Sequence, residues 1–189
     1  MKNEIRKKLK EMRNSMTDSE VLSKSALACQ AFIESKFYKN AKCIMIYKRL
    51  GNETDTDEII KQALSDNKKL VFPVTDQKSG KITPYYADGS TEFDIGGFSV
   101  SEPKNSAEAN PGDIDVILIP GIGFDKRGAR IGFGKGCYDM FLPQTDAVKI
   151  GFCFDFQLID KIPADCHDIN MDLIITERGI TDCQKSALL

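Results

Sequence analysis

The four residues Val116–Ile119 read Val-Ile-Leu-Ile and are followed directly by Pro120. A continuous apolar and β-branched run of this kind suits a strand that is buried on both faces of a parallel sheet. Other elements of the chain must then cover both faces of that sheet.

Strand and helix patterns alternate along the rest of the chain. Residues 2–14, 18–36 and 56–66 are predicted to be helical, and Thr17-Asp18-Ser19-Glu20 has the pattern of a capping box. The alternation predicts that residues 1–189 form a single domain, a three-layer α/β/α Rossmann-like fold with a mostly parallel sheet. The other elements expected are strands at 43–47, 70–72, 115–119, 149–154 and 172–177, an antiparallel strand at 82–87 and a surface excursion at 101–113.

Ligands in open α/β sheets bind outside the carboxyl ends of the strands. The loops 48–55, 120–136 and 155–168 each follow a predicted strand, so we expect them to gather at one edge of the sheet.

Glycine and charge concentrate in residues 120–142. This segment holds six of the fourteen glycines, together with Asp125, Arg130, Lys135 and Asp139. It lies between the buried strand and a predicted helix that opens at Cys137 and ends at Pro143. Backbone N–H groups in such a turn can cradle phosphate oxygens, and Arg130 and Lys135 would add countercharge.

The established phosphate motifs do not fit this segment. A Walker A loop ending in Gly134-Lys135 would need glycine at Ala129 and Ser or Thr at Gly136. The dinucleotide fingerprint starting at Gly132 fails because Cys137 stands at its third glycine. The segment therefore predicts a phosphate-binding loop of its own type, and a flexible turn with incidental charges is the alternative interpretation.

Composition is that of a small enzyme with one core. The 189 residues are 41% hydrophobic, and 26 basic against 28 acidic side chains give a formal net charge of −2. No overall positive field favours nucleic acid, and no apolar run is long enough to span a membrane. The six cysteines are scattered without a CxxC pair and no signal peptide is recognisable, so we expect reduced thiols and a cytoplasmic protein.

Single residues outside the glycine-rich segment are less informative. His167 is the only histidine, which excludes a multi-histidine metal site, and there is no G-x-S-x-G elbow for a serine hydrolase. At helical spacing, Lys2, Arg6 and Arg13 share one sector of the first helix, beside an apolar stripe. By spacing alone this sector is a solvated helix face, and Arg13 is predicted to be structural or at the surface.

With these residues in view, the chain resembles the 5-formyltetrahydrofolate cyclo-ligase family, also called 5,10-methenyltetrahydrofolate synthetase. The segment PGIGFDKRGARIGFGKGCYDMFL is similar to the family block PGxxFDxxGxRxGxGKGYYDxxL. Cys137 departs from it, because the family usually has an aromatic residue there, and Val74 stands where the family often has arginine. Further similarity covers nearly the whole chain: Lys2-Asn3-Glu4-Ile5-Arg6, Lys48 to Glu53, Glu102-Pro103, His167-Asp168, Met171-Asp172 and Thr176-Glu177.

The resemblance implies ATP-dependent closure of 5-formyltetrahydrofolate to 5,10-methenyltetrahydrofolate by a Mg²⁺-requiring ligase of folate one-carbon metabolism. It implies 5-formyltetrahydrofolate and ATP as partners and no nucleic acid or membrane, and we expect a monomer. The catalytic residues implied are Lys135 and Arg130, and the metal ligands are Asp139 and Asp168. The ATP-binding residues implied are Lys2, Arg6, Arg130, Gly132, Phe133, Gly134, Lys135, Gly136 and Tyr138. The substrate-binding residues implied are Lys48, Glu53, Phe133, Cys137 and Tyr138.

Two other functions stay open on the sequence. A phosphosugar isomerase on a similar scaffold would also use a glycine-rich phosphate loop, but would turn over without ATP. A nucleic-acid module built on the basic first helix is the other, and the near-neutral charge counts against it.

Overall fold

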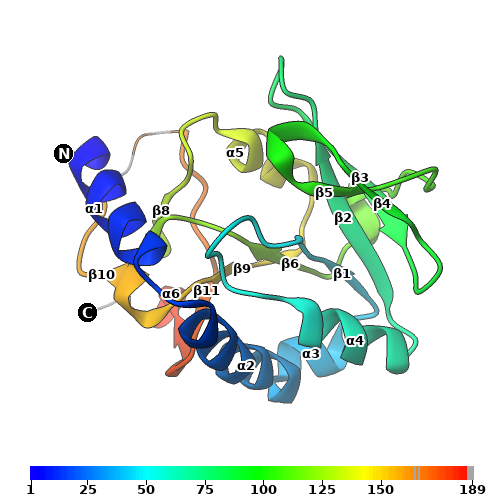
Figure 1. Cartoon of the computed structure of the whole chain (residues 1–189), viewed down its shortest axis with the longest axis horizontal. Coiled ribbons are helices and arrows are strands. Elements are labelled where there is room, and N and C mark those ends of the chain that lie inside the picture. The colour runs from blue at the N-terminus through cyan, green and yellow to red at the C-terminus, as the bar shows by residue number, and fades with distance from the viewer. Residues whose placement is uncertain (164, 166, 187–189) are drawn as a thin grey trace.

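The computed structural model describes residues 1–163, 165 and 167–186 and is an α/β domain around a seven-stranded sheet (Figure 1). The strand order is β12-β11-β9-β6-β1-β2-β3. The central strands β2, β1, β6, β9 and β11 are parallel, and β3 and β12 are antiparallel additions at the two edges. The strands of this sheet are β1 (Cys43–Met45), β2 (Lys69–Thr75), β3 (Ile82–Ala87), β6 (Val116–Ile119), β9 (Val148–Phe152), β11 (Leu173–Thr176) and β12 (Gly179–Asp182).

The predicted α/β/α fold with a mostly parallel sheet is confirmed. The strand predicted from Val-Ile-Leu-Ile is β6, which lies at the centre of the sheet and is buried along its whole length. The predicted antiparallel strand at 82–87 is β3. The edge strand β12 was not predicted.

Helices α2 (Asp18–Glu34), α3 (Lys36–Asn40) and α4 (Asp57–Ser65) cover one face of the sheet, below it in Figure 1. The predicted capping box starts α2: Thr17 accepts from the N–H of Glu20, whose carboxylate accepts from the N–H of Thr17. Alternate strand residues, such as Ile44 and Leu118, pack against these helices. Their neighbours Met45 and Ile117 point to the opposite face, as the two-residue period of a strand requires.

The opposite face of the sheet carries α5 (Cys137–Phe141), the 3₁₀ turn η3 (Leu142–Gln144) and α6 (Cys183–Ser186). Phe141, Leu142 and Cys183 pack there. The helix predicted to open at Cys137 is confirmed as α5, and Pro143 lies within the 3₁₀ turn that follows. Within the described part of the chain, no helix is both long and apolar enough to cross a membrane.

A small second sheet interrupts the glycine-rich segment, which was predicted as one turn between a strand and a helix. β7 (Gly123–Asp125) pairs antiparallel with β8 (Arg130–Ile131) and parallel with β10 (Leu158–Ile159). Helix α1 (Lys2–Asn14) packs on this sheet by inserting Leu9 into a cluster with Ile122 and Ile131. Alternation of strand and helix patterns cannot reveal such a short hairpin.

The excursion after β3 also contains short elements. Strands β4 (Phe93–Ile95) and β5 (Ser101–Pro103) form a two-stranded sheet, and the 3₁₀ turn η1 (Gly97–Ser99) joins them. The remaining 3₁₀ turns are η2 (Pro111–Asp113) and η4 (Asp155–Gln157).

The predicted gathering of loops at the carboxyl ends of the strands is confirmed by their contacts. Gln157 donates through Nε2 to the carbonyl oxygens of Gly121 and Ile122, at 3.0 and 2.9 Å. Arg13 of α1 contacts both the carbonyl oxygen of Gly121 and the Glu53 carboxylate, each at 3.5 Å. The loops after β1, β6 and β9 therefore meet beside α1.

The buried carboxylate of Asp125 organises the β7–β8 hairpin. This residue is 0% exposed. Its Oδ1 accepts from the N–H groups of Arg127 and Ala129, at 2.9 and 3.0 Å. Its Oδ2 accepts from the N–H of Ile162 and from Nη2 of Arg127, both at 2.9 Å. Asp125 therefore closes the hairpin and ties it to the chain that follows β10, a structural role.

Replacing Asp125 by asparagine tests this role. The amide NH₂ would face N–H donors, so we expect the free energy of unfolding to fall by about 3 kcal/mol. Urea unfolding followed by circular dichroism measures the change. The exposed Asp146→Asn is the control, with an expected change within about 0.5 kcal/mol. Equal stability of the two variants would contradict the role of Asp125.

Candidate functional site

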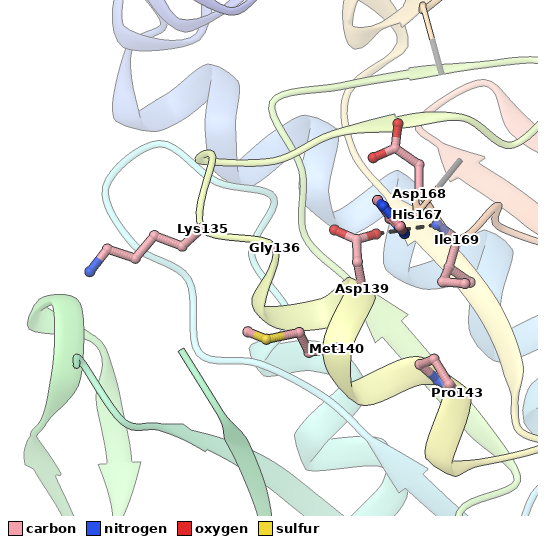
Figure 2. Close-up of a pocket in the computed structure, with 8 residues that line it drawn as sticks. All are labelled: Lys135, Gly136, Asp139, Met140, Pro143, His167, Asp168 and Ile169. Carbon is pink, nitrogen blue, oxygen red and sulfur yellow. Dashed lines mark hydrogen bonds between the residues drawn. The ribbon is translucent and has the colours of Figure 1, made fainter. Parts of the chain in front are cut away.

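A cleft of about 580 Å³ opens between the glycine-rich loop with α5 and the segment that precedes β11 (Figure 2). The carboxylates of Asp139, on α5, and Asp168 both line it. The family resemblance implied these two aspartates as metal ligands, and the structure brings both to this cleft. The cleft is lined by Lys135, Gly136, Asp139, Met140, Pro143, His167, Asp168 and Ile169.

Each of these carboxylates is paired with a cation expected to bind phosphate. Arg130 reaches Asp139 from β8, with 3.0 Å between Nη2 and Oδ2. The N–H of Ile169 donates to the other oxygen of Asp139 at 3.3 Å. Lys2, at the start of α1, places Nζ 2.7 Å from Oδ2 of Asp168 and 2.6 Å from Oδ2 of Asp165. Each aspartate of the cleft is therefore part of an ion pair.

The pairing shifts the pKa values of Lys2 and Asp168 in opposite directions. Hydrogen bonds from Lys2 to Asp165 and Asp168 raise the pKa of the ammonium group. Partial burial pushes the pKa of Asp168 upward, but the Asp165 N–H and the Lys2 ammonium outweigh it, and the pKa lies below its ordinary value. Asp168 therefore remains charged in mildly acidic solution.

The donor set of the cleft suits a hard cation that is held mainly by its substrate. Mg²⁺ is commonly bound through one or two carboxylates together with substrate phosphates. Asp139 and Asp168 supply two carboxylates at this cleft. Among residues 1–163, 165 and 167–186, no three His, Cys, Asp or Glu side chains converge as a metal cage. The two aspartates therefore suit a Mg²⁺ ion that binds together with a nucleotide. The ion would have to displace Arg130 and Lys2 from these carboxylates.

The glycine loop is contacted by α1 as well. Arg6 donates through Nε to the carbonyl oxygen of Gly132 at 3.0 Å and also contacts Asn3. Gly134 and Gly136 have φ values of 105° and 66°, a region that side chains disfavour. Arg6 therefore lies beside the glycine loop, whereas Lys2 contacts Asp168 at the cleft. Their role with phosphate stays a prediction.

Lys135 turns away from the two carboxylates. Figure 2 shows its side chain extending from the loop in the direction opposite to Asp139. Its Nζ donates to the carbonyl oxygen of Gln77 at 3.0 Å and lies 4.6 Å from the centre of the Phe98 ring. The structure thus does not bring Lys135 together with Arg130, the other expected catalytic residue.

Phe98 is a residue near the site that sequence reasoning missed. It lies on η1 with φ 57°, although non-glycine residues rarely adopt this region. Glu102 holds the turn in place, since its carboxylate accepts from the N–H groups of Thr75 and Gly97, at 3.0 and 3.2 Å. The signal available in the sequence was the pair Gly96-Gly97 directly before this aromatic residue.

A second group of side chains surrounds Glu53, which is buried in the loop after β1. Burial raises the pKa of the Glu53 carboxyl, and the Arg13 guanidinium opposes that rise without cancelling it. Burial also raises the pKa of Tyr138, and the Arg130 guanidinium lies over its ring at 5.3 Å. Phe133 is 51% exposed, with Arg13 at 5.6 Å from its ring centre. Arg13 therefore contacts both the Glu53 carboxylate and the Phe133 ring, and Arg130 contacts the Tyr138 ring.

The structure decides between two alternatives for Arg13. It was expected to be structural or at the surface; it is 4% exposed, which excludes the surface, and it contacts Glu53 and Phe133. The signal was its position in one sector with Lys2 and Arg6, which the same helix turns toward the site. Spacing cannot tell a buried basic stripe from a solvated one.

Lys48 and Cys137, two expected substrate-binding residues, make other contacts. Lys48 pairs with Asp57 at 2.8 Å and lies 5.6 Å from the centre of the Phe93 ring. Cys137 is half-buried at the edge of the core. Their roles in binding stay predictions.

Known proteins resemble this chain over almost its full length. The 5-formyltetrahydrofolate cyclo-ligase family profile matches residues 1–177. A 5-formyltetrahydrofolate cyclo-ligase of Mus musculus is 31% identical, covering 92% of this chain and 92% of its own. A probable 5-formyltetrahydrofolate cyclo-ligase of Caenorhabditis elegans is 29% identical, covering 94% and 93%.

Solved structures agree with these sequence matches. The Aquifex aeolicus 5,10-methenyltetrahydrofolate synthetase superposes with a TM-score of 0.86 at 29% identity, covering 97% of this chain and 93% of that chain. The Mycoplasma pneumoniae 5,10-methenyltetrahydrofolate synthetase superposes with a TM-score of 0.74 at 28% identity, covering 93% and 98%. By sequence and by fold, this chain belongs to the 5-formyltetrahydrofolate cyclo-ligase family.

Proposed function

We propose that this protein converts 5-formyltetrahydrofolate to 5,10-methenyltetrahydrofolate, using ATP and Mg²⁺ and releasing ADP and phosphate. The observation that supports the proposal is a continuous segment, residues 130–139, whose side chains lie in two different surroundings. On one side it contributes Arg130, the glycine loop and Asp139 to the charged cleft. On the other it places Tyr138 near the buried Glu53, and Phe133 against Arg13, the partner of Glu53. This one segment would thus contact both the phosphates of ATP and the flat pterin ring of the folate.

The chemistry needs activation of a poor leaving group. Transfer of the γ-phosphoryl to the formyl oxygen forms a P–O bond and breaks the bond between the β- and γ-phosphates. The N5 lone pair then makes the formyl carbon iminium-like. Attack by N10 forms the second C–N bond, N10 loses its proton, and phosphate leaves with the electrons of the C–O bond. Such a path needs positioning and charge stabilisation more than covalent catalysis.

The residues near the cleft suit these demands. Arg130, Lys135, Lys2 and Arg6 would hold phosphate oxygens, and the backbone of Gly132, Gly134 and Gly136 can approach them closely. Asp139 and Asp168 would hold Mg²⁺, which when bound neutralises charge on the phosphates. The residues proposed to contact the folate are Lys48, Glu53, Phe133, Cys137 and Tyr138. Glu53 would accept the N–H groups of the pterin, and Phe133 and Tyr138 would flank the nucleotide as well.

We also propose that one chain acts alone in the cytoplasm. Both halves of the proposed site come from elements of a single chain. The cysteines among the described residues, Cys29, Cys43, Cys137, Cys153 and Cys183, are free thiols, which suits a reducing compartment.

The defining experiment follows methenyltetrahydrofolate absorbance with purified protein. We expect product from the 5-formyl compound only when both ATP and Mg²⁺ are present, because the oxygen must be phosphorylated before it can leave. Omission of each in turn, and replacement of ATP by a non-hydrolysable analogue, are the controls. Product formation at an undiminished rate without nucleotide would remove the proposal.

Lys135→Ala tests a phosphate-stabilising role. Its Nζ is held by one carbonyl oxygen and an aromatic ring, so the exposed side chain can swing toward phosphate at little cost. We expect turnover to fall by about a hundredfold without loss of stability. Lys126→Ala, another exposed lysine of the same segment, is the control and should leave turnover unchanged. Wild-type turnover by the Lys135 variant would assign this lysine to the solvated surface.

Lys2→Met tests the pairing at the cleft. Loss of the ammonium should raise the pKa of Asp168 toward its ordinary value and weaken ATP binding by about tenfold. Carboxyl-carbon NMR titration and calorimetry measure the two effects. Asp165→Asn keeps both Lys2 and the backbone N–H that reach Asp168, so its Asp168 should keep a low pKa. If the pKa of Asp168 is the same in wild type and in Lys2→Met, the Lys2 ammonium does not lower it and this prediction is wrong.

A further inference from the structure

The Arg13–Glu53 pair is a buried ion pair at the proposed folate side of the site. The two side chains are 5% and 6% exposed, and Arg13 Nη1 lies 3.5 Å from Glu53 Oε1. The N–H of Leu50 donates to the other oxygen of Glu53 at 3.0 Å. The guanidinium also lies over Phe133, a proposed wall of the folate site, at 5.6 Å from the ring centre.

The guanidinium makes few and long contacts for a buried cation. Nη1 reaches the carbonyl oxygen of Gly121 at 3.5 Å, the same distance as its contact with Glu53. The Nε atom is buried without a hydrogen-bond partner. Burying a pair of charges costs desolvation that its attraction often fails to recover. We therefore do not expect this ion pair to contribute much to the stability of the fold.

Docking of α1 does not depend on the pair either. The side-chain amide of Asn52, next to Glu53, donates to the carbonyl oxygens of Arg13 and Met16, at 3.1 and 2.9 Å. These bonds join the end of α1 to the loop after β1 through the helix backbone. These two hydrogen bonds do not involve the Arg13 side chain.

The charge of Glu53 does depend on Arg13. Burial favours the protonated carboxyl and raises its pKa, and the nearby guanidinium favours the carboxylate. The other titratable groups that face Glu53 are the phenols of Tyr47, after β1, and Tyr138, on α5. Because burial raises the pKa of both phenols, neither supplies charge at neutral pH. Without Arg13, burial would act on the carboxyl with only the Leu50 N–H opposing it, so the pKa of Glu53 would rise further.

We propose that Arg13 is a positioning residue for Glu53: its guanidinium, which also lies over the Phe133 ring, keeps the carboxylate charged and fixed so that it can accept the paired N–H donors of a pterin. This inference rests on the proposed function. A neutral carboxyl would present its own O–H to those donors and lose one acceptor.

The test is 5-formyltetrahydrofolate binding measured by calorimetry as a function of pH, with the same titrations for an ATP analogue. In Arg13→Gln we expect folate affinity at neutral pH to fall by about tenfold or more, since a charged acceptor is lost. Affinity should recover as pH rises and Glu53 loses its proton. Arg13→Lys keeps a positive charge and should restore part of the affinity. ATP-analogue affinity should stay at the wild-type value.

Two further variants separate positioning from structure. In a Glu53→Gln background, Arg13→Gln should have little additional effect on folate affinity, because the group that Arg13 positions is gone. Asn52→Ala removes the backbone tie and should lower stability while leaving the pH dependence of folate binding as in wild type. Urea unfolding of every variant checks that the fold survives.

The outcomes are distinct. An equal loss of folate affinity on Arg13→Gln with and without Glu53, or an unshifted pH profile, would overturn the inference and leave the proposed function intact. Absence of folate binding by wild-type protein would overturn the proposed function, and this inference with it. A titration of the Glu53 carboxyl by NMR that is unchanged in Arg13→Gln would also count against the inference.

Discussion

The buried carboxylate of Asp125 is the interaction on which the site depends. A charge with no exposed surface persists only when its oxygens are saturated by donors. Here the turn between β7 and β8, and the chain after β10, supply those donors. The second strand of this hairpin, β8, contains Arg130, and the glycine loop follows it directly. The central sheet alone would not place these groups.

Helix α1 is the second element that assembles the site. Along one side, Lys2 reaches the carboxylates of the cleft, Arg6 the glycine loop, and Arg13 the loop after β1. Leu9, between them, fixes the helix in the apolar cluster under the hairpin. One helix therefore spans both the proposed phosphate side and the proposed folate side, so a shift of α1 would change both together.

Charge balance shapes the proposed site more than any single residue. Arg130 and Lys2 are paired with Asp139 and Asp168, and Arg13 with Glu53. At the proposed phosphate side, a nucleotide with its metal would exchange the partners of Arg130 and Lys2, because phosphate would take these cations and the metal would take the two aspartates. The charges are then kept compensated both before and after binding, which avoids the cost of unpaired charge in a partly buried cleft.

The sequence by itself determined the layered fold, the buried central strand, the capped helix at Asp18 and the family. Each of these follows from local patterns of apolar, glycine and capping residues. The family resemblance also implied Asp139 and Asp168 as ligands of one metal ion, and both line one cleft. The sequence did not reveal the β7–β8 hairpin, the left-handed turn at Phe98, the burial of Arg13 or the direction of Lys135. These depend on contacts between residues far apart in the chain: Asp125 with Ile162, Glu102 with Thr75, Arg13 with Glu53, and Lys135 with Gln77. Only the tertiary structure decided them, because the same side chain is solvated or buried according to which distant segment packs against it.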